Sequence, residues 1–171
     1  MKMFILFIVA LGVQAAAGQE GYPVPPNADG RLFYIQHSNN HNTFVYDANF
    51  SGYKKLDANE PVTIYRINYE DGGVKEPLTS IQRKMAYGIN FKNKGQNVFE
   101  FSLAAYPEKT LLLKLHSNGK PYVSVTVNGK PIVLRKMFLY CNKLGTKVSH
   151  IDFYGTDASH KDVKERFFIS K

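Results

Sequence analysis

Apolar and polar residues alternate along the C-terminal half of the chain, most regularly between Thr110 and Tyr154. A period of two places apolar side chains on one face of a β-strand and polar side chains on the other. Two similar turn sequences, Asn118-Gly119-Lys120-Pro121 and Asn128-Gly129-Lys130-Pro131, interrupt the alternation. The pattern therefore predicts an antiparallel meander whose strands are joined by short turns.

The turn at Asn128-Gly129 also predicts how its two strands pair. Asn followed by Gly suits a two-residue type I′ turn, because both central residues of that turn need a positive φ. The resulting register pairs Val127 with Lys130, Val125 with Ile132 and Val123 with Leu134. One face then carries Val123, Val125, Ile132 and Leu134, and the other carries Tyr122, Ser124, Thr126 and Arg135. The same reasoning at Asn118-Gly119 pairs Leu111–Leu115 with the strand that starts at Tyr122.

Further strands are predicted on both sides of this meander. They are Arg31–Gln36, Thr43–Tyr46, Pro61–Tyr69, Ile89–Lys92, Val98–Ala104, Val148–Tyr154 and Arg166–Ile169. We expect a mainly β fold, a single antiparallel meander-built barrel or sandwich of about nine strands. Hairpins between neighbouring strands favour an up-and-down barrel. A polar loop from His37 to Asn42 and a long irregular connection from Asp47 to Asn59 separate the early strands.

One short helix, at about 79–87, interrupts the strands. Leu78, Ile81, Met85 and Ile89 recur at helical spacing. Thr79 and Gln82 have the spacing of a capping box, and Gly88 is placed to end the helix in the left-handed conformation. Because so short a helix is not stable alone in water, we expect its Ile81–Met85 face to lie on an apolar surface.

The N-terminus has the layout of a secretory signal peptide. Lys2 precedes the apolar run Phe4–Val13, and the small residues Ala15–Gly18 follow it. We expect residues 1–18 to be removed, residues 19–30 to form an extended leader, and residues 31–171 to form a single β-rich domain. The protein is then exported, periplasmic or extracellular, with no membrane span after cleavage. An uncleaved membrane anchor is the alternative.

Charge and cysteine content narrow the functional classes. The net charge is +8, from 22 Lys and Arg against 14 Asp and Glu, but the basic residues are scattered and form no long run. Scattered lysines are typical of solubility rather than of nucleic-acid binding, so no nucleic-acid partner is expected. The single cysteine, Cys141, lies in an apolar stretch and is expected to be a buried small hydrophobe rather than a nucleophile.

The most unusual polar stretch is the loop from His37 to Asn42. Two His and three Asn in six residues are able to bind a ligand, and the candidate ligand-binding residues are His37, Asn39, Asn40, His41, Asn42 and Asp47. A structural metal site requires about four close ligands, and no Cys or Glu stands near, so we predict neither a metal site nor a cofactor. The alternative is that the Asn side chains stabilise turns by bonding their own backbone.

No catalytic residues are predicted. Ser149 and His150, together with Asp152, and Ser159 and His160, together with Asp157, lack the Gly-x-Ser-x-Gly elbow that presents a nucleophile. Neighbours on a strand point to opposite faces, so Ser149 and His150 are not expected to meet. The sequence also contains no phosphate-binding loop, dinucleotide fingerprint or metalloprotease helix.

Three segments resemble a known family. They are Leu32–Asn49, Leu56–Tyr69 and Leu78–Gly88, and the most specific part is Ser38-Asn39-x-x-Asn42-Thr43 followed by Tyr46. In these segments the chain resembles the family called domain of unknown function four-eight-three-three. The resemblance implies a small secreted protein and brings no activity, cofactor or catalytic residue.

The leading functional hypothesis is a non-catalytic binding or interaction module. Its ligand is a small apolar molecule if a barrel encloses a pocket, and a glycan or a protein if the interior is filled and an outer face binds. One alternative is a metal- or water-dependent hydrolase that uses the His37–Asp47 region. Another is a basic structural protein of the cell envelope.

Overall fold

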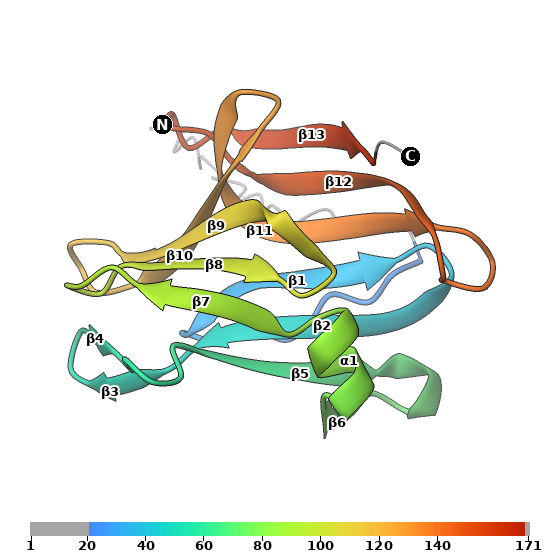
Figure 1. The fold of residues 1–171 in the computed structure, drawn as a ribbon, viewed down its shortest axis with the longest axis horizontal. Helices are drawn as coiled ribbons and strands as arrows, with labels where there is room; N and C mark the ends of the chain where they lie inside the picture. The colour runs from blue at the N-terminus through green and yellow to red at the C-terminus, as the bar shows by residue number, and fades with distance from the viewer. Residues whose placement is uncertain (1–20, 170–171) are drawn as a thin grey trace, which may run out of the picture.

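The computed structural model describes residues 21–169. The predicted signal peptide and the first two leader residues, Gln19 and Glu20, lie outside the described residues. The fold is mainly β with one short helix, as predicted (Figure 1). Its elements are β1 (Arg31–His37), β2 (Asn40–Ala48), β3 (Phe50–Gly52), β4 (Lys55–Leu56), β5 (Val62–Asn68), the 3-10 turn η1 (Tyr69–Asp71), β6 (Val74–Pro77), α1 (Ser80–Met85), β7 (Ile89–Asn93), β8 (Phe99–Leu103), β9 (Tyr106–Leu115), β10 (Pro121–Val127), β11 (Lys130–Cys141), β12 (Val148–Thr156) and β13 (Asp162–Phe168).

Eleven of these strands form one sheet, in which β11 is the branch point. The longest path runs β6-β5-β2-β1-β11-β10-β9-β8-β7, and β12 and β13 extend from the other edge of β11. The first half of β11 pairs with β10 up to Leu134, and from Lys136 onward β1 takes the place of β10. A bulge at Arg135 marks the change of partner. Because β1 runs parallel to β11, the sheet is mixed rather than wholly antiparallel.

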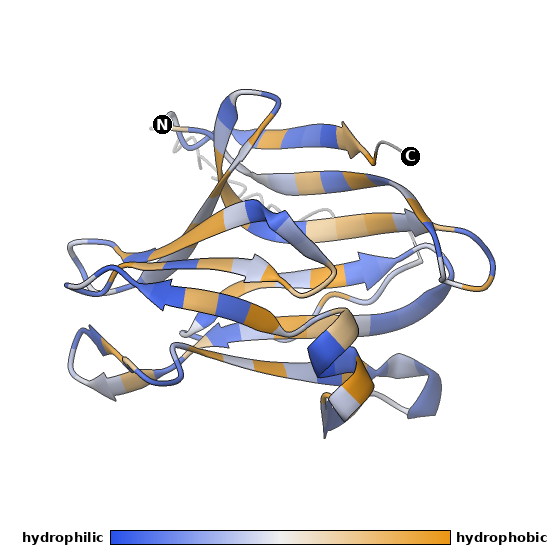
Figure 2. Ribbon diagram, in the orientation of Figure 1, coloured by the Kyte–Doolittle hydropathy of each residue, from blue (hydrophilic) through white to orange (hydrophobic). Residues whose placement is uncertain are grey.

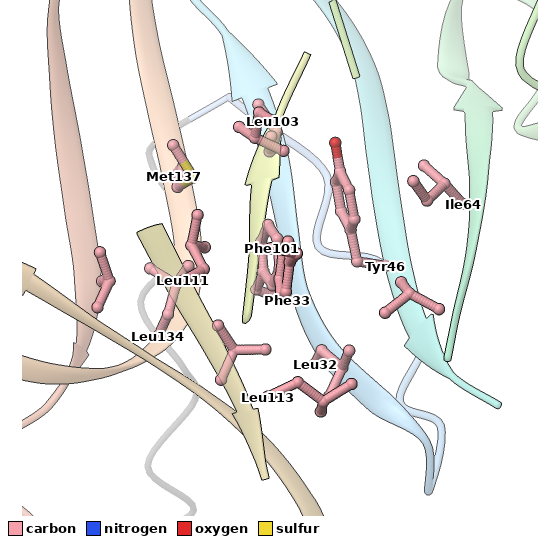
Figure 3. Close-up of a cluster of buried hydrophobic side chains, with 14 of the residues drawn as sticks. Leu32, Phe33, Tyr46, Ile64, Phe101, Leu103, Leu111, Leu113, Leu134 and Met137 are labelled. Carbon is pink, nitrogen blue, oxygen red and sulfur yellow. The ribbon is translucent and has the colours of Figure 1, made fainter. Parts of the chain in front are cut away.

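The departure of β10 from β11 lets the sheet curl over itself. Strands β7 and β8 lie over β1 and β2, and β9 lies over β11 (Figure 1); the path ends at β6 and β7 without closing in the described residues. Hydrophobic and hydrophilic residues alternate along the strands (Figure 2), so each layer turns one apolar face inward. Phe33 of β1 stacks on Tyr46 of β2 and faces Phe101 of β8, with ring centroids 4.3 and 6.3 Å apart (Figure 3). The result is an open half-barrel with a filled interior.

The hairpin register predicted for Asn128-Gly129 is confirmed. Val127 faces Lys130, Val125 faces Ile132 and Val123 faces Leu134, and both turn residues have a positive φ, 51° and 78°. The turn at Asn118-Gly119 is wider than predicted. Only Gly119 has a positive φ there, and the backbone bond from His116 to Lys120 closes a longer loop.

Two stretches expected to be irregular contain strands. The polar loop is only the two-residue turn Ser38-Asn39, because Asn40–Asn42 already belong to β2. The connection from Asp47 to Asn59 contains the end of β2 and the small hairpin β3–β4. Polar side chains at the outer end of a strand do not prevent backbone pairing, so composition alone placed these boundaries wrongly.

The helix is partly as predicted. Thr79 Oγ1 accepts a bond from Gln82 N at 3.2 Å and Thr79 N donates to Gln82 Oε1 at 3.0 Å, which confirms the capping box. The prediction for its apolar face is wrong, since Ile81 and Met85 are 75% and 72% exposed. The neighbouring Leu78 and Tyr87 contact the core instead, on either side of the helix.

Gly88 does not adopt the predicted left-handed conformation. The helix ends at Met85, with Ala86 as its C-cap. A Cβ at Gly88 would lie 2.0 Å from the carbonyl oxygen of Arg83, so close backbone packing explains the glycine.

Gly155 provides a test of the branch in the sheet. It pairs with Leu134 beside the bulge, where a Cβ would lie 2.0 Å from the Val133 carbonyl oxygen. Gly155→Ala should therefore lower the free energy of unfolding by about 3 kcal/mol, because β11 and β12 must separate to admit the methyl group. Gly52→Ala, where nothing lies within 4 Å, is the matched control. Equal urea midpoints for the two variants would contradict the close approach.

Candidate functional site

One face of β1, β11, β12 and β13 points away from the core, and we call it the outer face. Strand register places Tyr34, Lys136, Tyr154 and Lys164 in one row across it. The next row contains Gln36, Phe138, Asp152 and Arg166. Both rows combine aromatic and charged side chains, unlike the apolar inner face of the same strands.

Six rings make a continuous aromatic strip along the outer face. In order, the strip contains His41, Tyr22, Phe138, Tyr140, His150 and Phe168. Successive ring centroids are 5.0, 4.9, 5.0, 4.1 and 5.6 Å apart. Phe138 is buried at the base of the strip, and Phe168 at its end is exposed. The strip therefore joins the leader, β2, β11, β12 and β13 in one surface.

Asp152 organises the charges beside the strip. Its side chain is fully buried and accepts bonds from Arg166 at 2.7 and 2.9 Å and from Lys164 at 2.9 Å. Burial alone raises the pKa of Asp152, but the bonds from Arg166 and Lys164 outweigh burial and hold the pKa at about 2. Both carboxylate oxygens are engaged, so this residue fixes the positions of two cations.

Lys136 is the third cation and has a different environment. The residue is only 5% exposed, and its Nζ lies 5.2 Å from the ring centroids of Phe138 and Tyr154 and 6.0 Å from that of Tyr34. Nζ makes no hydrogen bond to any residue between 21 and 169. Burial, with a smaller contribution from the Lys164 ammonium group, lowers the pKa of Lys136 to about 8.

The leader lies across part of the outer face. Gln36 Nε2 donates to the Pro23 carbonyl oxygen at 2.6 Å and to Thr43 Oγ1 at 3.0 Å. Tyr22 packs edge-on against Phe138, and its ring also contacts His41. These contacts position Tyr22 within the aromatic strip.

The sequence model of a family described as Domain of unknown function (DUF4833) matches residues 33–166. The chain belongs to this family. No curated protein and no solved structure matches the chain. Within residues 21–169, no helix has the length and apolar character needed to cross a membrane. Four strip residues, His41, Phe138, Tyr140 and His150, lie inside the DUF4833 match.

Within the DUF4833 domain, the predicted site residues do not converge on one place. His37 points into the core, where it stacks with Phe44 and its Nε2 lies 3.0 Å from the Tyr87 hydroxyl. His41 lies on the outer face against Tyr22. Asp47 pairs with Arg31 at 2.6 Å and accepts from the Tyr65 hydroxyl at 3.0 Å. The two imidazoles therefore lie on opposite faces of the sheet.

The three asparagines of the predicted site, Asn39, Asn40 and Asn42, lie in the β1–β2 hairpin of the DUF4833 domain. Asn40 Oδ1 accepts from the Asn42 backbone amide at 3.0 Å, which is the local bonding that the alternative interpretation expects. The Oδ1 atoms of Asn39 and Asn42 are buried and have no hydrogen-bond partner among the described residues. No group of three or more His, Cys, Asp or Glu side chains within residues 21–169 is arranged to hold a metal ion.

Ser149 and His150 do meet, contrary to the prediction. Ser149 Oγ lies 3.0 Å from His150 Nδ1, because it turns back along the strand edge toward the Tyr140 carbonyl oxygen, to which it donates at 3.1 Å. The hydroxyl proton is thus directed at a carbonyl, whereas a nucleophilic serine needs it directed at the imidazole. Asp152 makes no bond to Ser149 or His150 among the described residues, since Arg166 and Lys164 occupy both of its oxygens.

Sequence reasoning missed the residues that the DUF4833 domain gathers on its outer face. Lys136, Phe138 and Tyr140 alternate with the inward-facing Met137 and Leu139. This period of two could have predicted the outer face, because it places three large aromatic or charged residues on the side of the strand expected to be solvated. Their connection to β12 and β13 depends on strand pairing, which the local sequence does not specify.

Proposed function

We propose that the protein is an exported binding module without catalytic activity, and that its outer face binds a carbohydrate. The observation that carries the proposal is the continuous aromatic strip, which lies beside Lys136, Lys164 and Arg166. Sugar rings have flat C–H faces that pack on aromatic rings, and their hydroxyls bond to charged and polar groups nearby.

The filled interior supports an outer-face ligand over an enclosed apolar one. Phe33, Tyr46 and Phe101 occupy the space between the layers (Figure 3). Two open hollows of about 410 and 520 Å³ lie elsewhere on the surface, one over β8–β10 and one beside the β9–β10 turn. Neither hollow contains a residue of the aromatic strip.

The charges on the outer face favour a carbohydrate over a protein partner. The centres of protein interfaces contain few Lys and Asp residues. Here Asp152, Lys164 and Arg166 form a bonded group directly beside Phe138 and Tyr140. Rings interleaved with fixed charges suit a ligand whose own surface alternates apolar C–H faces and hydroxyl groups.

The test is glycan binding by the purified secreted protein. Tyr140→Ala should weaken binding to an immobilised oligosaccharide by about tenfold, because it removes a ring from the middle of the strip. Tyr53→Ala is the matched control, since Tyr53 is exposed on the β3–β4 turn, away from the strip. Equal affinities of the two variants, or no binding to any glycan at millimolar concentration, would refute the proposal.

A further inference from the structure

Lys136 is a mostly buried residue, 5% exposed, and its Nζ has no hydrogen-bond acceptor within residues 21–169. An ammonium group has three donors, and a buried polar group without partners is costly. The rings of Tyr34, Phe138 and Tyr154 attract the positive charge through their faces, but they do not accept hydrogen bonds as oxygen does. The rings therefore offset only part of the cost of burying the charge of Lys136, whose pKa stays low, and residues 21–169 leave its donors unused.

The carboxylate of Asp152 does not fill this role. Its Oδ1 accepts from Arg166 Nε, and its Oδ2 accepts from Arg166 Nη2 and Lys164 Nζ. The Lys164 ammonium group lies close enough to Lys136 to repel it. The centre of the outer face thus has three cations and one carboxylate, an excess of positive charge that an anion would neutralise.

Two cations share one ring at this centre. Lys136 Nζ lies 5.2 Å and Lys164 Nζ lies 5.3 Å from the ring centroid of Tyr154. The Arg166 guanidinium lies 5.3 Å from the ring centroid of Tyr140, within the aromatic strip. A ligand stacked on the strip therefore brings its substituents alongside the cations.

We infer that the ligand is an acidic carbohydrate and that Lys136 binds its carboxylate. This inference rests on the proposed carbohydrate function and names the class of sugar. Lys164 and Arg166, held by Asp152, attract the same negative charge from the side, and the aromatic strip holds the neutral faces of the adjoining sugar rings.

The experiment compares two probes with the same sugar backbone: an oligogalacturonate of about ten units, which is charged, and its methyl ester, which is not. The secreted protein should bind the free acid about tenfold or more tightly than the ester, as expected for a bond to a charged group. Lys136→Met keeps a side chain of similar length and should reduce this preference to about one. Lys84→Met, which removes a charge from α1, is the matched control and should keep the preference.

Each alternative result has a definite meaning. Equal binding of acid and ester by the unmodified protein would overturn the inference and leave the carbohydrate proposal standing, whereas binding of neither probe would count against both. If Lys136→Met and Lys84→Met lost the preference for the acid equally, the preference would come from general charge attraction and not from a site at Lys136. Equal binding of a sulfated oligosaccharide of the same length would overturn the assignment of a carboxylate.

A thermal melt separates a binding effect from a folding effect. Because burial disfavours the charge of Lys136 and lowers its pKa, replacing it by Met should leave the Tm unchanged or higher. A loss of acid binding together with a lower Tm would overturn the direct role of Lys136.

Discussion

Replacing Phe33 by alanine should lower the free energy of unfolding by about 4 kcal/mol, the largest effect that we expect from a single substitution. The side chain is fully buried and is in contact with both layers of the half-barrel, through Tyr46 on β2 and Phe101 on β8 (Figure 3). Its removal leaves a cavity between the two layers of the curled sheet. Urea unfolding at neutral pH measures the effect.

Phe50→Ala is the control for this prediction. It makes the same chemical change on β3, where the ring is 41% exposed, and should cost less than about 1 kcal/mol. If the two variants unfolded at the same urea concentration, Phe33 would not join the two layers as described.

Acidification should destabilise the protein by about 3 kcal/mol between pH 7 and pH 4 through His37 alone. Burial lowers the pKa of His37 from 6.5 to about 4, so the unfolded chain binds a proton in this range that the folded chain does not. Stability is therefore complete above pH 6.5 and falls as the pH drops toward 4. Free energies of unfolding at pH 7, 5.5 and 4 measure the change.

His37→Phe should remove most of this pH dependence. Phenylalanine has a flat ring of similar size for the stack with Phe44 and Tyr87, although the bond to the Tyr87 hydroxyl is lost. His116→Phe, at an exposed position, should leave the pH dependence intact. Asp152 affects stability in a lower pH range. Its pKa is about 2 instead of the ordinary 3.8, so its stabilisation is lost only as the pH falls from 3.8 toward about 2. A wild-type slope retained in His37→Phe would refute the assignment.

The parts of the fold that short-range chemistry determines were predictable from sequence. Asn128 and Gly129 set their hairpin and its register, and Thr79 and Gln82 set the start of the helix. The parallel pairing of Tyr34 with Lys136 was not predictable, because the two residues are far apart in the chain and no turn sequence connects their strands. The exposed Ile81 and Met85 show that helical periodicity alone did not identify the buried side.

The same contrast between local patterns and long-range strand pairing applies to the candidate site. Composition drew the prediction to His37–Asn42, but alternation along β1 places the His37 ring inward with Ile35, away from His41 on the outer face. The outer face is assembled from β1, β11, β12 and β13, and its rows exist only when these strands are in register. A period of two in Lys136–Tyr140 indicated which residues face outward, whereas their neighbours came from pairing across strands.

The branch at β11 also sets the order in which the strands are able to pair as the chain folds. Strand β1 finds its parallel partner only about a hundred residues later, a separation typical of high contact order and slow folding. Until Lys130–Cys141 has been synthesised, the amino-terminal hairpin exposes a strand edge that can pair with another chain. Nascent molecules consequently benefit from being kept extended until the complete polypeptide is available.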